Sequence, residues 1–598
     1  MRLLPILVVA VLLAPAAFAQ TGQIKLLALT ETSGGAAEGS VARLTLEIRQ
    51  GDERVFLETL PLTKIATQIS VRFAQQIACK ELRQDCGDKD FIYTIVSQPG
   101  LVGGPSAGAA AAVLTAAMLE GRTLRDDVAI TGTINGGGII GPVGGVKEKI
   151  EAASRNGVRT VLVPAGTKVF GESNVTLNLT AWGERNNVTV IEVATLDDAL
   201  FQFTGVRPAR EETNLSIDDT YLRRMNAVAQ LICRRTSNLS TDDGTDEEGI
   251  IEHARNLTVR SDALYRDGRY YAAASYCFRA NIEWNTFLTR QRNESRQQLG
   301  GRIKRTFRML AQLSDTVDQR ELRTMTDLQT YISVQERILE AADALVEATK
   351  SLEEEPDASR DLIVYAEERL VSARSWMAFF GLPGQALVLS KDALERSCLA
   401  KLSEAEERFS YVRSFAPDGL DETRTTLDRA HLDARNGSFA LCLGKASKAK
   451  AEADLIVTGS AYEEDQLKQL LGLKLGVVRR EMAAAQRNGY FPLIGYNYYE
   501  YALSLAQDDP YSALLFAEYA LELTNVDVYF SQERSPIEAL LRREVQLRTA
   551  ELFAAMLAAA LVGAAGAMLV LRKRSAATRR HSKPSPAPLA RRRRGKKR

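Results

Sequence analysis

Histidine is scarce in this chain of 598 residues, which holds only three: His253, His431 and His581. None of them lies between residues 20 and 206, where the most distinctive motifs occur. A catalytic triad with histidine as its base is therefore excluded there. The chain also has no His-Glu-x-x-His zinc motif and no Gly-x-x-x-x-Gly-Lys-Ser/Thr phosphate-binding loop, so we expect neither a metal nor a nucleotide cofactor.

Net charge is also nearly absent, at +1, so no overall field points to nucleic acid as a partner. The last 27 residues nevertheless carry thirteen lysines and arginines and no acid, and they follow an uncharged stretch over residues 552–571. About 20 apolar residues span a bilayer, and basic residues stay on its cytoplasmic side. We therefore expect a transmembrane helix over residues 548–571 and a basic cytoplasmic tail over residues 572–598. A buried core helix is the alternative.

Residues 1–19 have the pattern of a secretory signal peptide, with an apolar run that ends in the cleavage-like Ala17-Phe18-Ala19. A retained anchor is the alternative. The two ends together predict a single-pass protein of the cell membrane, with its N-terminal ectodomain on the cell-surface or periplasmic side. The six cysteines fall into sequence-neighbour pairs, which indicates disulfides in an exported chain, with buried free thiols as the alternative.

The chain changes character near residue 206. Short strand-like runs alternate with helical spacing over residues 20–206, which predicts a mixed α/β domain. Long helical patterns over residues 207–547 predict an all-α domain of helical hairpins. Turns such as Asn436-Gly437 precede helices rich in alanine and aromatic residues, which loosely resembles tetratricopeptide hairpins without a strict period.

Two glycine-rich turns each lead into a helix at a residue that could take part in catalysis. The first, Gly104-Pro105-Ser106, delivers Ser106 to the start of an alanine-rich helix, where free N–H groups and the helix dipole favour developing negative charge. The second leads into a helix at Lys147, and a lysine can act as a base when burial lowers its pKa and leaves the amine neutral. Taken alone, Ser106 is more typical of a helix N-cap and Lys147 of a solvated lysine.

Together, and in this order, the two turns resemble the peptidase domain of the Lon family. The nucleophile motif Gly-Pro-Ser-Ala-Gly is matched by residues 104–108, and the base motif Gly-Gly-x-Lys-Glu-Lys by residues 144–149. Lys147 lies 41 residues after Ser106, a spacing that also resembles the family's. The resemblance implies a nucleophile, a general base, a threonine that orients the lysine amine, and two supporting turn residues: Ser106, Lys147, Thr131, Gly104 and Pro105.

Two positions depart from the family's pattern. Thr133 stands where the family usually has glutamate, and Gly103 where many members have aspartate. Because the sequence has no phosphate-binding loop, we expect it to lack the ATP-driven unfolding module that normally accompanies this domain. With the expected signal peptide and anchor, the chain resembles the archaeal surface branch of the family.

The resemblance implies an ATP-independent serine endopeptidase that hydrolyses flexible or unfolded polypeptides outside the membrane. The neutral Lys147 amine would take the Ser106 proton, and backbone N–H groups around residues 104–106 would hold the oxyanion. Whether the chain forms a homo-oligomer stays open. Two other interpretations remain: a catalytically inactive, membrane-anchored binding or scaffold protein that acts through its helical domain, and a peptidase that cleaves only itself.

Overall fold

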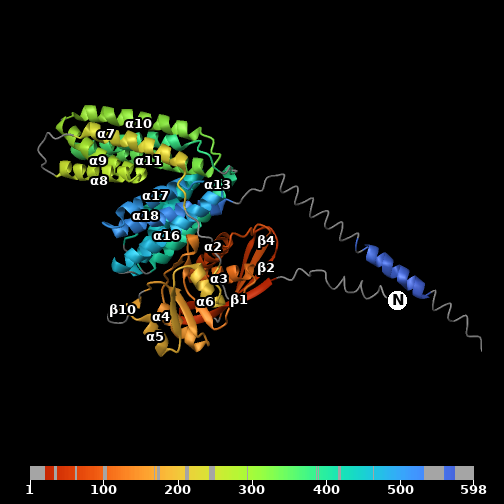
Figure 1. Cartoon of the computed structure of the whole chain (residues 1–598). Helices are drawn as coiled ribbons and strands as arrows, with labels where there is room; N and C mark the ends of the chain where they lie inside the picture. The colour runs from red at the N-terminus through yellow and green to blue at the C-terminus, as the bar shows by residue number, and fades with distance from the viewer. Residues whose placement is uncertain are drawn as a thin grey trace, which may run out of the picture. The chain divides into compact units, whose positions relative to one another are not determined.

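The computed structural model describes residues 20–530 with short gaps, together with residue 556 and residues 558–572 (Figure 1). The gaps are 32–36, 61–62, 98–103, 168, 171–175, 209–214, 241–248, 293, 385–386, 388, 415, 417–418 and 462–463. The predicted signal peptide over residues 1–19 and residues 573–598 of the predicted tail fall outside the described residues. All described residues up to 530 belong to one compact unit.

A mixed seven-stranded sheet forms the centre of the N-terminal region. Its strand order is β11-β8-β5-β1-β2-β4-β3. The strands are β1 (Gln20–Glu31), β2 (Ala37–Gln50), β3 (Val55–Leu60), β4 (Lys89–Val96), β5 (Val128–Ile130), β8 (Thr160–Pro164) and β11 (Thr189–Val193). Strand β2 pairs antiparallel with β1 and β4, and the other pairs run parallel. Two small ribbons accompany the sheet: β6 (Thr133–Ile134) with β7 (Ile140–Gly141), and β9 (Val169–Phe170) with β10 (Thr176–Leu177).

Helices cover both faces of this sheet. Successive strand residues point to opposite faces, and Leu26 and Leu27 accordingly belong to two separate apolar clusters. The cluster of Leu26 includes residues of α2 (Ile65–Glu81), α3 (Gly108–Leu119) and α6 (Leu196–Thr204). The cluster of Leu27 includes residues of α4 (Val146–Arg155) and α5 (Leu179–Arg185). The sequence therefore folds as a three-layered α/β region.

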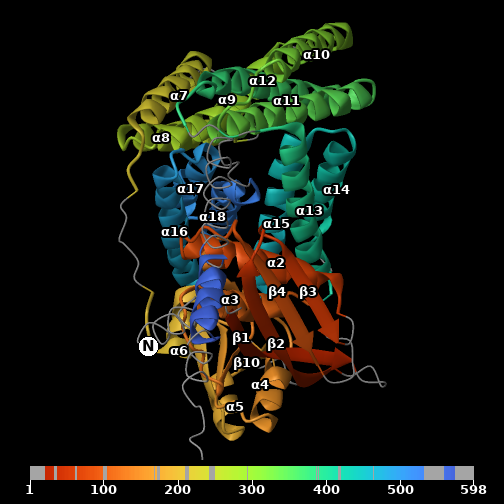
Figure 2. The ribbon, with the colours of Figure 1, turned by 90° about the vertical axis from the view of Figure 1, so that its right-hand side faces the viewer.

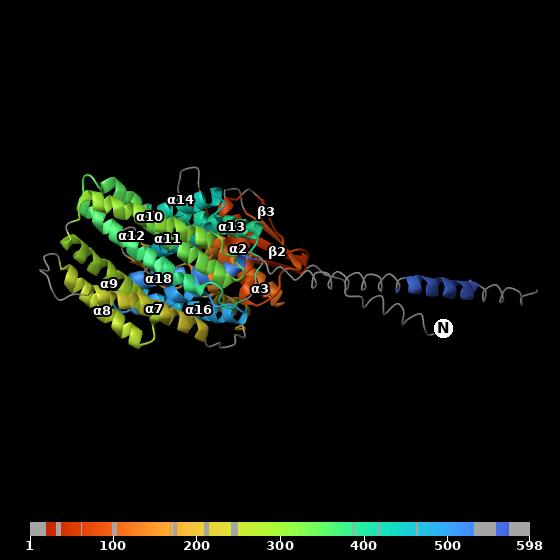
Figure 3. The ribbon, with the colours of Figure 1, turned by 90° about the horizontal axis from the view of Figure 1, so that it is seen from above.

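A large helical region follows. Its first helices are α7 (Asp219–Leu239), α8 (Ile250–Arg266), α9 (Tyr270–Gln291), α10 (Arg296–Asp318), α11 (Met325–Ser351) and α12 (Pro356–Trp376), which lie side by side in Figure 3. The others are α13 (Lys391–Arg413), α14 (Asp421–Arg435), α15 (Phe439–Ala461), α16 (Glu464–Arg487), α17 (Leu493–Leu505) and α18 (Pro510–Thr524). Helices α13, α14 and α15 pack together, as Figure 2 shows.

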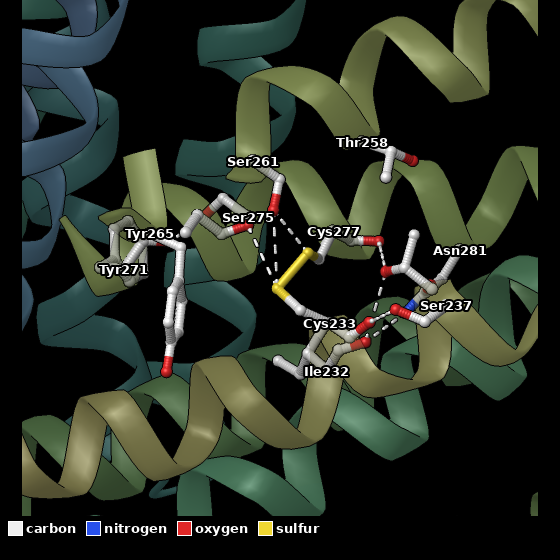
Figure 4. The surroundings of a disulfide bond; sticks show 12 residues. Ile232, Cys233, Ser237, Thr258, Ser261, Tyr265, Tyr271, Ser275, Cys277 and Asn281 are labelled. Carbon is white, nitrogen blue, oxygen red and sulfur yellow. Dashed lines mark hydrogen bonds between the residues drawn. A yellow bond between two sulfur atoms is a disulfide. The ribbon is translucent and has the colours of Figure 1, made fainter. Parts of the chain in front are cut away.

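The three expected disulfides are present, and they join the sequence-neighbour pairs: Cys79–Cys86, Cys233–Cys277 and Cys398–Cys442. The last two have the same separation of 44 residues, and each joins the first and third helix of a consecutive set of three. At the first of these, the Ser261 hydroxyl donates to the Cys277 sulfur over 2.6 Å (Figure 4). The prediction of disulfides is confirmed.

The helical region contacts the loops that follow strand β5. The Arg408 guanidinium of α13 donates to Asn135 Oδ1 over 2.9 Å. Lys80, near the end of α2, forms an ion pair with Asp527 over 3.0 Å. The first contact joins helix α13 to the residue after strand β6, and the second joins helix α2 to the residues after helix α18.

The predicted transmembrane helix over residues 548–571 is wrong. A spanning helix needs about 20 consecutive apolar residues. Among the described residues, no helix combines that length with sufficient apolar character to cross a bilayer. The predicted single-pass location in the cell membrane, which depended on this helix, is wrong with it.

Candidate active site

Ser106 lies in a single 3-10 turn, η1 (Pro105–Ala107), immediately before helix α3. Gly104 enters this turn with φ of 118°, a backbone conformation that is strained for any residue with a Cβ. Pro105 is buried, whereas Ser106 is half-buried. The serine therefore stands at the N-terminal, positive end of the α3 dipole, where an oxyanion is favoured.

Backbone hydrogen bonds tie the Ser106 turn to the end of strand β5. The Gly132 N–H donates to the Ser106 carbonyl over 3.3 Å, and the Ala109 N–H donates to the Gly132 carbonyl over 3.1 Å. Thr131, the residue before Gly132, is fully buried. The fold thus brings together Ser106 and Thr131, two of the residues singled out in the sequence.

The lysine that meets Thr131 is Lys149. Its Nζ donates to Thr131 Oγ1 over 3.1 Å and to the Gly144 carbonyl over 3.0 Å. Its residue is only 2% exposed. Burial lowers the pKa of Lys149 from 10.5 to about 7, although Glu148 opposes that shift. A substantial share of Lys149 is therefore neutral near pH 7 and able to accept a proton.

Lys147 lies on another face of the same helix. Its Nζ stands over the Trp182 ring, 4.9 Å from the ring centre, and its residue is half-buried. Residues two apart on a helix do not share a face, so Lys147 and Lys149 cannot both point at Thr131. The structure does not bring Lys147 to Thr131, and the orienting hydrogen bond expected for Lys147 is made by Lys149.

The phase of helix α4 explains why Lys149 is the buried lysine. Gly145 caps the helix with φ of 65°, and the buried stripe runs from Val146 through Lys149 and Ile150 to Ala153. This spacing of three, four and seven residues is visible in the sequence itself. The same spacing predicts that Lys149 lies on the buried face, although Lys147 comes first in the motif.

Ser106 is hydrogen-bonded to Gly132 through its backbone, and Lys149 is hydrogen-bonded to Thr131 through its amine. Among the hydrogen bonds of the described residues, none joins the Ser106 hydroxyl to a lysine amine. Catalytic hydrogen bonds in enzymes without substrate are often long and tighten when substrate binds. The described residues also hold no group of three or more His, Cys, Asp or Glu side chains that could bind a metal ion.

No motif or periodicity in the sequence predicts that the helical region contacts this site. The Tyr411 hydroxyl of α13 accepts a hydrogen bond from the Gly144 N–H over 2.7 Å. Glu404, Glu407 and Arg408 of the same helix line a small cavity beside the Ser106 turn, together with Pro105 and Thr133. Gly103, one of the two departures noted above, falls outside the described residues.

Comparison with known proteins points to the same region. Residues 80–200 match the model of the "Lon protease (S16) C-terminal proteolytic domain". A Lon protease of Paraburkholderia phytofirmans is 36% identical over 142 residues, which are 23% of this chain and 17% of the relative. Lon protease 1 of Herpetosiphon aurantiacus is 54% identical over 61 residues, 10% of this chain and 8% of that protein.

The matches cover only a small part of each relative. Lon protease 2 of Syntrophobacter fumaroxidans is 42% identical over 98 residues, 16% of this chain and 12% of that protein. The chain thus spans less than a fifth of the length of these curated relatives. Residues 80–200 are similar to the proteolytic domain of Lon proteases, and this similarity supports a peptidase of the serine type.

Proposed function

We propose that this chain is a serine endopeptidase in which Ser106 is the nucleophile and Lys149, rather than Lys147, is the general base. The observation that carries the proposal is the environment of Lys149. Its amine is buried, hydrogen-bonded to Thr131, and has its pKa lowered to about 7. A general base works best when its pKa lies near the operating pH, and an ordinary solvated lysine would be protonated there.

The first half of the reaction forms an acyl-enzyme. The neutral Lys149 amine takes the proton of the Ser106 hydroxyl as Oγ attacks the carbonyl carbon of the peptide bond. Backbone N–H groups at the start of η1 and α3 stabilise the oxyanion of the tetrahedral intermediate. The Lys149 ammonium then donates its proton to the leaving nitrogen, the C–N bond breaks, and an ester to Ser106 remains.

The second half regenerates the enzyme. Lys149, neutral again, takes a proton from a water molecule as the water oxygen attacks the ester carbon. The ester C–O bond breaks, Ser106 recovers the proton from Lys149, and the carboxylic acid product leaves. Thr131 and the Gly144 carbonyl hold the amine in the orientation that both proton transfers need.

The proposed substrates are flexible or unfolded polypeptides, and the reaction is proposed to need no ATP. The sequence has no phosphate-binding loop of the Gly-x-x-x-x-Gly-Lys-Ser/Thr type, which an ATP-driven unfolding module would need to bind its nucleotide. An extended backbone can reach an active-site serine without mechanical work, whereas a folded chain must first be unfolded. Peptide hydrolysis therefore fits substrates that are already unfolded.

The test is cleavage of an unstructured, fluorescently labelled protein such as casein by the full chain without nucleotide, beside labelling by a serine-directed fluorophosphonate. The wild-type chain should cleave and be labelled once, and the Ser106→Ala variant should do neither. Ser97→Ala, a change at the end of strand β4, is the matched control and should retain both. Absence of both signals from the wild type would refute the proposal and favour the inactive binding protein.

A further inference from the structure

A second cavity lies wholly within the helical region. It has a volume of about 250 Å³, which is room for more than a few water molecules. It lies between helices α7, α9, α11 and α12 on one side and α15, α17 and α18 on the other. Its aromatic lining comprises Tyr271, Phe278, Trp376, Tyr498, Tyr501 and Phe516. None of these residues contributes to the peptidase site described above.

The charged lining of this cavity has an excess of cations, with four basic residues against two glutamates: Arg279, Arg337, Arg369 and Lys448 against Glu336 and Glu340. Both glutamates are already paired. Lys448 pairs with Glu336 over 2.6 Å, and Arg369 with Glu340 over 2.8 Å. The net charge of the lining therefore favours an anionic group.

Arg337 is the cation best placed to receive that group. Its guanidinium lies 4.2 Å from the centre of the Trp376 ring, and it donates to Ser372 Oγ over 3.2 Å and to the Ser333 carbonyl over 2.7 Å. Within the described part of the chain, no carboxylate forms an ion pair with Arg337. A guanidinium fixed in this way is preorganised to bind a carboxylate in two-point fashion.

We propose that this cavity binds the C-terminal end of a polypeptide whose last residue is aromatic or large and aliphatic. Arg337 receives the terminal carboxylate, and the aromatic lining takes the last side chain. Arg279 is exposed although it lines the cavity, so the rest of the peptide has a route to solvent. The ligand class rests on the proposed function, because a site for chain ends serves an enzyme that acts on unfolded or already cleaved polypeptides.

Binding is measured in the Ser106→Ala chain, which separates it from cleavage. The probe is a fluorescein-labelled octapeptide that ends in phenylalanine, with either a free carboxylate or a carboxamide, and the readout is fluorescence anisotropy. The free acid should bind at least tenfold more tightly than the amide. Arg337→Gln should remove that difference, whereas the matched control Arg320→Gln, whose guanidinium lies over Phe380, should keep it.

Equal affinity for acid and amide would overturn the proposal, as would no binding of either peptide at 1 mM probe or an unchanged preference in Arg337→Gln. None of these results would affect the proposed peptidase, because the measurement does not use Ser106. Conversely, failure of the cleavage test leaves this binding experiment fully interpretable.

A separate observation concerns the peptidase site itself. Gly144 is held on both sides of its Cα, because its N–H donates to Tyr411 over 2.7 Å and its carbonyl accepts from Lys149 over 3.0 Å. Tyr411 belongs to helix α13, so one chain of hydrogen bonds runs from the helical region to Thr131 through Gly144 and Lys149.

We infer that Tyr411 is a positioning residue for the proposed base. It fixes the Gly144 N–H, and the carbonyl of the same residue, in the next peptide unit, accepts from the Lys149 amine. Without the Tyr411 hydroxyl, the backbone can rotate about the φ and ψ angles of Gly144 and withdraw the carbonyl from Nζ. A carbonyl acceptor stabilises the ammonium more than the amine. Its withdrawal therefore lowers the pKa of Lys149 and leaves the amine less firmly oriented.

The test is the pH–rate profile of Tyr411→Phe beside Tyr365→Phe. Tyr365 is a matched control, because its hydroxyl also accepts a hydrogen bond, from Arg369 Nε over 2.9 Å, but does not contact the site. In Tyr411→Phe, kcat at pH 9 should fall about tenfold, KM should stay within twofold, and the acid limb should move to lower pH by at least 0.3. Tyr365→Phe should leave all three unchanged.

A carbon-13 NMR titration of lysine Cε in the Ser106→Ala chain gives the same shift without turnover. It keeps this inference testable even if the wild-type chain proves inactive, which would count against the proposed function alone. An unmoved titration of Lys149 in Tyr411→Phe would overturn the inference, and so would a loss of rate with an unmoved acid limb.

Discussion

Buried lysines occur in both the α/β region and the helical region, but their surroundings differ. Lys149 of the α/β region donates to a hydroxyl and a carbonyl, and among the described residues no ion pair reaches it. Lys450 of the helical region is equally buried, but it forms ion pairs with Asp454 and Glu522. Burial lowers the pKa of Lys149 to about 7, whereas these carboxylates raise the pKa of Lys450 despite its burial.

The comparison shows that burial alone does not make a base. A carboxylate beside a buried amine holds the proton on it, and the charge then serves to stabilise the packing. The pairing has the opposite effect on the carboxylate: burial raises the pKa of Glu522, but Lys401 and Lys450 outweigh it and lower that pKa to about 2. Of these two lysines, Lys149, which forms no ion pair with any described residue, is the one free to lose and regain a proton near neutral pH.

The largest expected effect separates Lys149 from its neighbour on helix α4. Lys149→Met should reduce kcat by at least about 10³, since the proposed base is lost while a side chain of similar length keeps the packing. Lys147→Met should retain kcat within about threefold, because Lys147 stands over Trp182 and away from Thr131. Casein cleavage by the two variants measures the difference. A severe loss in Lys147→Met with an active Lys149→Met would restore Lys147 as the base.

The same substitution in the helical region should act on stability instead. Lys450→Met leaves Glu522 with one fewer cation in a buried site, which should cost about 3 kcal/mol of unfolding free energy. Urea unfolding of the variant and the wild type measures this loss. An undiminished stability would mean that the Lys450 charge is not paired in solution as it is in the structure.

Much of the candidate site was readable from the sequence because it is local. The glycine-rich turn before Ser106 and the end of the strand at Thr131 are short patterns with direct structural meaning. The choice between Lys147 and Lys149 was also local, but it depended on which face of α4 is buried. The apolar residues Val146, Ile150 and Ala153 mark that face and assign it to Lys149.

Contacts between segments far apart in the chain could not be predicted from the sequence. Tyr411 lies 267 residues from Gly144, and no periodicity or motif relates the two. The pairing of cysteines was easier, because each partner is the next cysteine along the chain. The uncharged stretch over residues 552–571 predicts a spanning helix wrongly, because composition alone does not establish one.

The pH dependence of catalysis should follow the Lys149 amine. The base acts in its neutral form, so kcat/KM should fall about tenfold for each pH unit below the pKa of about 7 and level off above it. Cleavage of a short unstructured peptide between pH 5 and pH 9 gives this profile. An acid limb near pH 10 would mean that the base is solvated, and would remove the contrast with Lys450.

The smallest effect is the influence of Lys149 on stability. Its folded pKa of about 7 lies below the unfolded value, so between these values the unfolded chain binds more protons and stability rises with pH. The contribution of Lys149 to the free energy of unfolding is therefore fully present above the unfolded pKa near 10.4, and it is lost as pH falls toward 7. Between pH 7.5 and pH 9, the free energy of unfolding of the wild type should therefore rise by on the order of 1 kcal/mol per pH unit relative to that of Lys149→Met. Urea unfolding of both chains measures this difference. Other titrating groups are common to both chains and cancel in the difference, so parallel pH curves would show that Lys149 is not desolvated in the folded protein.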